Sequence, residues 1–231
     1  LSFGGGVRGN ATVNSGIAAL SLGATSNAYD LSFSGATNAF GGASGGDLSF
    51  TNTGALTLGN ASGATFNFGG ALTATSASSL SLGGTLTAAS AVSLANASTP
   101  IALLGTTTID TWGANGAITL ANGVDLAAGA SGSFTLRSGS GTISLQGAIG
   151  QASSLSAVAI NDQAGNTGLA TIGTATTAGS VRASAITLGA TDLAGSATLQ
   201  ADTISLSGAL GSTASGRRQS LTLLSRTAGT A

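Results

Sequence analysis

The chain has 231 residues, of which 42% are hydrophobic and only 6% charged, and its formal net charge is −1. The six basic residues are all Arg, the seven acidic residues are all Asp, and Lys, Glu, His, Cys and Met are absent. Because nucleic acid and anionic lipid attract clustered basic residues, this composition predicts no nucleic-acid partner and no electrostatic membrane binding. The hydrophobicity is too high for a disordered chain. No apolar run approaches the ~18 residues of a spanning helix, so we expect an ordered protein without membrane insertion.

Short strands separated by small residues are predicted along the chain. Strand candidates lie at 17–22, 31–33 and 48–50, with the start of a loose region at 4–6 and a flexible Gly-rich turn at 41–46. From residue 54 to residue 104, apolar–polar–apolar triplets recur, each followed by Gly, Ala, Ser, Thr or Asn. A period of two places the outer residues of a triplet on one face of a strand and its middle residue on the other. The recurrence of these triplets indicates a repeat architecture.

The repeat lapses at 109–116, around Trp112. Triplets return at 118–120, 124–126, 134–136 and 143–145, and in the last third at 186–188, 197–199, 204–206 and 221–223. No segment shows a sustained helical period with caps, so we predict essentially no helix. Binding residues concentrate on loops held by a regular scaffold, which makes Asp110 and Trp112 the candidate binding-loop residues. The alternative is a structural Trp in the core or at the end of a coil.

The spacing of the triplets predicts the architecture. The sequence positions of Leu56, Leu72 and Leu86 differ by 16 and 14, and those of Ile186 and Ile204 differ by 18. The short segments of small residues between triplets suit the corners of a coil, in which each strand pairs with its counterpart one coil later. We therefore predict an all-β fold, a single-stranded parallel β-helix (β-solenoid) with roughly 14–19 residues per coil. Residues 1–231 are expected to form one continuous solenoid segment of a longer chain.

The scarcity of charge fits this architecture. Corresponding positions stack from coil to coil, where two like charges repel by ~1 kcal/mol even in water. Ser, Thr and Asn can instead hydrogen-bond along such a stack.

No catalytic, cofactor or metal site is predicted. Without His, Cys, Lys or Glu, the chain lacks Ser–His, Cys–His and Lys-based nucleophiles and the usual ligands of structural zinc. The aspartates are scattered, and we interpret them as turn or surface residues. Asp110 and Asp125 are 15 positions apart and could stack on neighbouring coils, so an acid–base pair is the alternative hypothesis. We interpret 45–48, which matches part of a calcium-binding nonapeptide, as a Gly-rich turn.

Threonine runs at 106–108 and 174–177 raise an ice-binding interpretation, but the middle residue of the triplets varies, which favours a solvated polar ladder.

Two longer blocks also repeat. LQGAIG at 145–150 and LSGALG at 206–211 share one form, and ASAITL at 183–188 is similar to ADTISL at 201–206. These blocks resemble the β-strand repeats of filamentous-haemagglutinin-like adhesins and autotransporter passenger domains of bacteria, and the resemblance covers nearly the whole chain. It implies a right-handed β-helix that is exported by a type V route. It also implies a stalk or adhesin that acts outside a Gram-negative cell or on its outer surface.

The expected function is therefore structural and adhesive, without catalysis, in cell-surface or biofilm attachment. The expected partners are neighbouring solenoid segments of the same chain or other copies, and a glycan or protein of a host or bacterial surface. One alternative is a self-assembling subunit of an extracellular filament, because uncapped solenoid ends expose strand edges that invite pairing. A third hypothesis is an ice-binding or polysaccharide-active β-helix.

Overall fold

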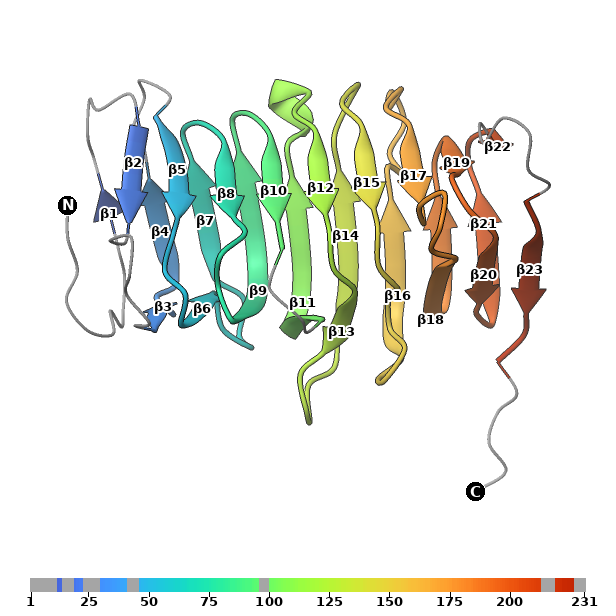
Figure 1. Cartoon of the computed structure of the whole chain (residues 1–231), viewed down its shortest axis with the longest axis horizontal. Helices are drawn as coiled ribbons and strands as arrows, with labels where there is room; N and C mark the ends of the chain where they lie inside the picture. The colour runs from blue at the N-terminus through green and yellow to red at the C-terminus, as the bar shows by residue number, and fades with distance from the viewer. Residues whose placement is uncertain are drawn as a thin grey trace.

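The computed structural model describes residues 12–13, 19–22, 30–40, 46–95, 100–212 and 219–226 and shows a parallel β-solenoid. Figure 1 shows the strands stacked along the long axis, from β1 at one end to β23 at the other. The predicted all-β parallel solenoid is confirmed. Among the described residues, the single helical element is the 3-10 turn η2 (Trp112–Ala114).

The strands form two sheets. In stacking order, the nine-stranded sheet contains β2 (Ala19–Leu22), β5 (Asp47–Phe50), β8 (Leu72–Ala74), β10 (Val92–Leu94), β12 (Ile118–Leu120), β15 (Ile143–Leu145), β17 (Ala170–Ile172), β19 (Thr191–Leu193) and β22 (Leu210–Gly211). In chain order, the 14-stranded sheet contains β1 (Thr12–Val13), β3 (Leu31–Phe33), β4 (Thr37–Phe40), β6 (Ala55–Leu58), β7 (Thr65–Phe68), β9 (Ser79–Ala88), β11 (Ile101–Asp110), β13 (Val124–Leu126), β14 (Ser133–Arg137), β16 (Leu155–Ile160), β18 (Gly179–Leu188), β20 (Ala197–Gln200), β21 (Thr203–Leu206) and β23 (Leu221–Leu224).

Each turn of the solenoid contains three strand segments. Two of them belong to the 14-stranded sheet, which is divided lengthwise into two strips, and the third belongs to the nine-stranded sheet. The long strands β9, β11 and β18 belong to both strips; the first half of β9 pairs with β6 and its second half with β7. Strip one contains β3, β6, β13, β20, β23 and the first halves of the long strands. Strip two contains β1, β4, β7, β14, β16, β21 and the second halves. The nine-stranded sheet is strip three.

The turns are longer than the sequence predicted. The sequence interval between in-register partners one turn apart is 18 for Ile186 and Ile204, which is the shortest case, and 24 for Leu56 and Leu80. The predicted coil length of roughly 14–19 residues is therefore wrong for most turns. The physical reason is that Leu56 and Leu72 do not lie one above the other. They belong to strips one and three of the same turn, so their spacing measures only part of a turn.

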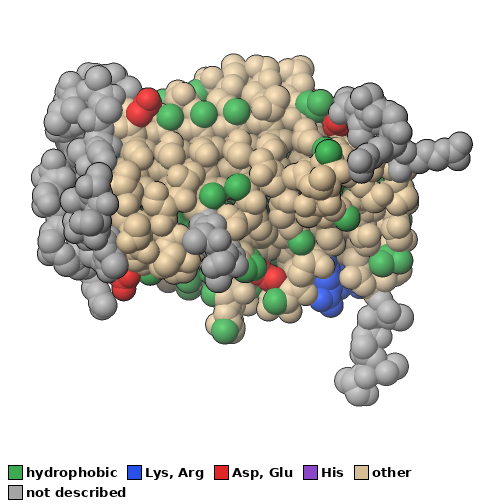
Figure 2. All heavy atoms as spheres, viewed as in Figure 1, with side chains coloured by type: hydrophobic (Ala, Val, Ile, Leu, Met, Phe, Trp, Pro, Cys, Tyr) green, Lys and Arg blue, Asp and Glu red, His purple; other side chains and the backbone are tan. Residues whose placement is uncertain are grey.

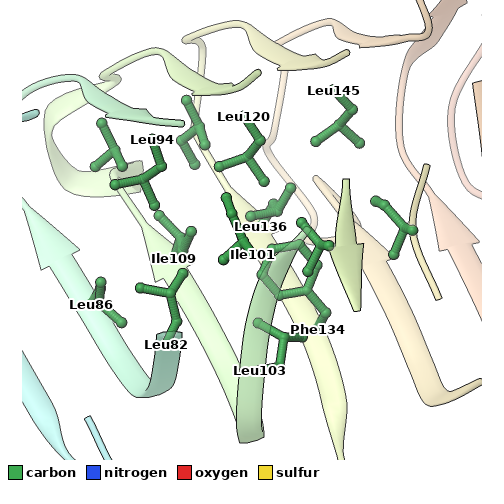
Figure 3. Close-up of a cluster of buried hydrophobic side chains, with 14 of the residues drawn as sticks. Leu82, Leu86, Leu94, Ile101, Leu103, Ile109, Leu120, Phe134, Leu136 and Leu145 are labelled. Atoms are coloured by element: carbon green, nitrogen blue, oxygen red, sulfur yellow. The ribbon is translucent and has the colours of Figure 1, made fainter. Parts of the chain in front are cut away.

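The outer residues of the triplets point inward and form the core. Figure 3 shows Leu94, Leu120 and Leu145 of strip three in a row, opposite Ile109 and Leu136 of strip two. All five side chains are at most 2% exposed. Burial of each such aliphatic side chain contributes about 1.5–3 kcal/mol, so the stack itself stabilises the fold.

Aromatic side chains fill one stretch of this otherwise aliphatic core. The ring centroids of Phe40 and Phe68, which are in-register partners, lie 5.3 Å apart with an interplanar angle of 9°. Phe33 meets Phe40 edge to face, also at 5.3 Å. Such pairs add about 0.5–1.5 kcal/mol beyond burial. The turns that contain β3 to β8 are therefore the bulkiest part of the core.

The surface carries few charges. Figure 2 shows a face on which polar uncharged side chains and backbone predominate, with isolated acidic and basic groups. Within the described ranges, no helix is long and apolar enough to cross a membrane.

Candidate functional site

The irregular stretch around Trp112 is a corner that joins strip two to strip three, between β11 and β12 (Figure 1). Thr111 at its start is fully buried, and its Oγ1 donates to the carbonyl oxygen of Gly116 at 2.6 Å. Asn115 adopts the left-handed conformation (φ 55°), and its backbone N–H donates to the carbonyl of Trp112 at 3.1 Å. The corner is therefore closed by its own hydrogen bonds, which suits a preformed surface feature.

Asp110 and Trp112, the two residues proposed from the sequence, meet in this corner. Oδ1 of Asp110 accepts a hydrogen bond from the backbone N–H of Trp112 at 2.8 Å. Asp110 ends β11 and lies in register between Thr87 of the preceding turn and Arg137 of the following one. Its carboxylate satisfies an amide at the start of η2 that has no partner within the helix. That either residue binds a ligand stays a prediction.

The half-buried Trp112 lies beside the next corner. A Cβ atom placed on Gly139 would lie 3.2 Å from Cδ1 of Trp112 and 2.8 Å from its carbonyl oxygen. Gly139 has φ +63°, a conformation that favours glycine. One edge of the indole therefore lies close to the backbone of the following turn.

A hollow of about 570 Å³ lies on the other side of the Trp112 corner. It arises because the corners after β7 and β9 span only 69–71 and 89–91, whereas the corner after β11 spans 111–117 and projects beyond them. Asn67 and Thr87 supply polar side chains, and the remaining lining is small or apolar. The lining residues are Ala39, Phe40, Asn67, Phe68, Gly69, Thr87, Ala88, Ala89, Gly113 and Ala114. We call this hollow the corner groove. Such a surface fits a neutral ligand better than a charged one.

Sequence reasoning located the corner but missed the groove. Its walls come from four turns, and only the strand register shows that two short corners lie next to a long one. The unequal intervals between successive triplets were the signal available in the sequence.

The structure does not stack Asp110 and Asp125. The register partner of Asp110 in the following turn is Arg137 in strip two, whereas Asp125 lies in strip one and pairs with Ala102. The two aspartates do lie on neighbouring turns, but in different strips, because the interval between them is shorter than a full turn. Asp125 is 7% exposed and accepts from the backbone N–H groups of residues 126, 152 and 153 at 3.0, 2.6 and 2.8 Å. These hydrogen bonds connect its carboxylate to the corner that contains residues 152 and 153.

Two outward columns of small polar side chains run along the rod. In strip three, the middle residues of consecutive triplets form the hydroxyl column Thr73, Ser93, Thr119, Ser144 and Thr171. In strip two, a second column contains Thr37, Thr65, Thr85, Thr108 and Thr135. The sequence did not reveal the strip-two column, because only the strand register aligns Thr135, the middle residue of its triplet, with threonines such as Thr65 and Thr85 that precede theirs. Both columns present neutral hydrogen-bonding groups at the inter-strand spacing of ~4.8 Å.

Across the part of the chain that the structure describes, no three His, Cys, Asp or Glu side chains are grouped as a metal site. No family model, no curated protein and no solved structure matches this chain. The functional argument therefore depends on the geometry and on the resemblance of the sequence repeats.

Proposed function

We propose that this chain is a structural and adhesive module of a large bacterial surface or secreted protein, located outside the cell or on its outer surface. The observation that carries the proposal is the hydroxyl column of strip three, which continues in unbroken parallel register over a fully buried aliphatic core. Parallel stacking makes each turn a support for the next, so such a rod holds its surface at a fixed distance and orientation. The module acts by holding its binding surface at a distance from the cell and by making many shallow polar contacts along the rod.

The corner groove is the most specific contact point on this rod. It is hollowed and mainly apolar, with an amide and a hydroxyl from Asn67 and Thr87. A neutral sugar presents both C–H surfaces and hydroxyl groups, and ligand sites usually combine apolar lining with a few placed polar groups. We therefore propose a glycan, or a neutral protein surface, as the partner.

The test measures binding of the immobilised full chain to a panel of glycans, surface proteins and whole cells. Ala114→Arg fills the groove from its exposed wall, and Ala128→Arg adds the same charge and bulk at an exposed position away from it. We expect binding that the first variant lowers at least tenfold and the second leaves unchanged. Equal binding by both variants would exclude the groove as the contact point. Absence of binding to every surface would overturn the adhesive function.

A second candidate, a self-assembling filament subunit, is favoured by one observation. Leu206 and Leu223, which continue the buried inward rows of Leu188 and Leu199, are 45% and 56% exposed. Exposed aliphatic rows beside strand edges favour pairing with another β-structure. If copies stack at this end, the chain sediments as concentration-dependent fibres, and Leu223→Lys abolishes them. Leu169→Lys, at a 40% exposed leucine in the middle of the rod, is the matched control. Fibres that survive Leu223→Lys would contradict this assembly.

A further inference from the structure

The corner between β16 and β17, residues 161–169, carries an unusual concentration of side-chain oxygens. Asn161, Asp162, Gln163 and Asn166 follow one another within six positions. Asn161 is 2% exposed, and its Nδ2 donates to the carbonyl of Gly168 at 3.1 Å, which closes the loop. Its Oδ1 accepts from Nδ2 of Asn166 at 2.9 Å. The loop is thus folded by its own amides.

Two oxygens of this loop lack a hydrogen-bond partner. Oδ1 of Asp162 and Oδ1 of Asn166 are shielded from solvent, and neither accepts a hydrogen bond from a described group. Both residues line a hollow of about 380 Å³ that extends to Gly189 and Ser207 of the following turns. Buried acceptors without donors are costly and rare in native structures, and an ion is one of the partners that accounts for them.

We propose that this loop is a calcium-binding site, with Oδ1 of Asp162 and Oδ1 of Asn166 as its side-chain ligands. Calcium takes six to eight oxygens at about 2.3–2.6 Å, including carboxylate, amide and backbone carbonyl oxygens. Gly165, with φ +88°, closes the turn between the two ligands. The irregular loop suits calcium better than magnesium, which demands a near-ideal octahedron.

The charges around the loop set the expected affinity. Asp162 is the single carboxylate of the loop, and Arg137 lies nearby, because its guanidinium donates to Oε1 of Gln163 at 2.7 to 3.0 Å once that amide is oriented to satisfy both groups. Low ligand charge gives weak sites, so we expect a dissociation constant on the order of 1 mM. A nearby cation weakens the site further. Removal of the Asp162 carboxylate should therefore raise the dissociation constant for calcium, and removal of the Arg137 charge should lower it.

The experiment follows backbone amide signals of the full chain by NMR during titration with calcium chloride at constant ionic strength. We expect saturable shifts confined to residues 161–169 and the adjoining corner, with a midpoint on the order of 1 mM. Asp162→Asn removes the charge at constant shape and abolishes the shifts. Asn166→Asp adds a carboxylate and lowers the midpoint at least tenfold. Arg137→Gln lowers it a few fold, since the opposing charge is gone.

Thr167→Ala is the matched control, because this exposed residue of the same loop takes part only through its backbone N–H. Magnesium at equal concentration is the second control, and it should give no saturable shift. Shifts that never saturate, or that persist in Asp162→Asn, would overturn the proposal. Equal midpoints for the parent chain and Asn166→Asp would do the same. The outcome of this titration is independent of the proposed adhesive function, because calcium binding is measured on the isolated chain.

Discussion

Gly84 is the position where the close approach of successive turns can be measured most cleanly. It lies in β9 at the bend between strips one and two, with φ +89°. A Cβ atom there would overlap the backbone oxygen and nitrogen of Ala64 in the preceding turn. That backbone cannot easily move, because Ala64 is 2% exposed and its carbonyl accepts from Thr85 N–H at 2.8 Å. Gly63 has the same φ of +89°, yet a Cβ there would meet nothing within 4 Å. The two glycines differ in surroundings but not in φ.

Gly63→Ala should therefore report conformational strain alone, about 1 kcal/mol. Gly84→Ala adds the overlap with the neighbouring turn, about 1–3 kcal/mol more by analogy with overpacked cores. We expect the midpoint of urea unfolding to fall clearly further for Gly84→Ala, at similar m-values. Equal losses in the two variants would refute the reasoning, because the left-handed conformation would then explain the whole effect and the turns would not be in close contact.

Two other predictions concern charge. Asp125→Ala removes a carboxylate that accepts three backbone N–H groups at 2.6 to 3.0 Å, so we expect a loss of about 3 kcal/mol in unfolding free energy and faster hydrogen exchange in the 150–153 corner. Asp202→Asn, which weakens an exposed ion pair, should cost under about 0.5 kcal/mol, and a similar cost for Asp125→Ala would contradict the anchoring role. Aspartates placed together at Ser93 and Thr119, which are register partners, should destabilise the chain by ~1 kcal/mol more than the sum of the single changes. Salt should relieve this excess, and purely additive effects would show that the column tolerates charge.

Much of the fold was predictable because its local rule is simple. In a triplet such as Leu72-Thr73-Ala74, the alternation of buried and half-exposed residues follows directly from the pleat of a strand. The small residues between triplets made a parallel coil more plausible than hairpins. Turn length was not predictable in this way, because triplets of all three strips have the same form. Only pairing reveals that Leu56 and Leu72 lie in strips one and three of the same turn, and that Leu72 lies one turn before Val92.

The candidate sites were predictable only as interruptions of the repeat. Trp112 was detectable because it breaks the pattern, and the corner exists where expected. The groove beside it depends on which corners are neighbours, which a list of spacings does not encode. The loop at 161–169 was missed because oxygen-bearing residues such as Asn161 and Asn166 read as ordinary turn formers. Their significance depends on buried oxygens without donors, which is a three-dimensional property.

Asp30, Asp47 and Asp125 show where the stack of turns accommodates a negative charge. Asp30 and Asp47 each precede a triplet, and each Oδ1 accepts from the backbone N–H of the equivalent residue one turn later, Ala55 and Ala71, at 2.7 Å. The same device thus appears in strips one and three, and Asp125 uses a related one. A carboxylate is stabilised where backbone N–H groups face it and is costly elsewhere in the stack. The short side chain of Asp reaches an amide one inter-strand spacing away, whereas the extra methylene of Glu would carry its carboxylate past that amide. At Asp30, Asp47 and Asp125 a carboxylate thus replaces a hydrogen bond between turns, whereas the outward columns carry hydroxyl groups that stack without repulsion.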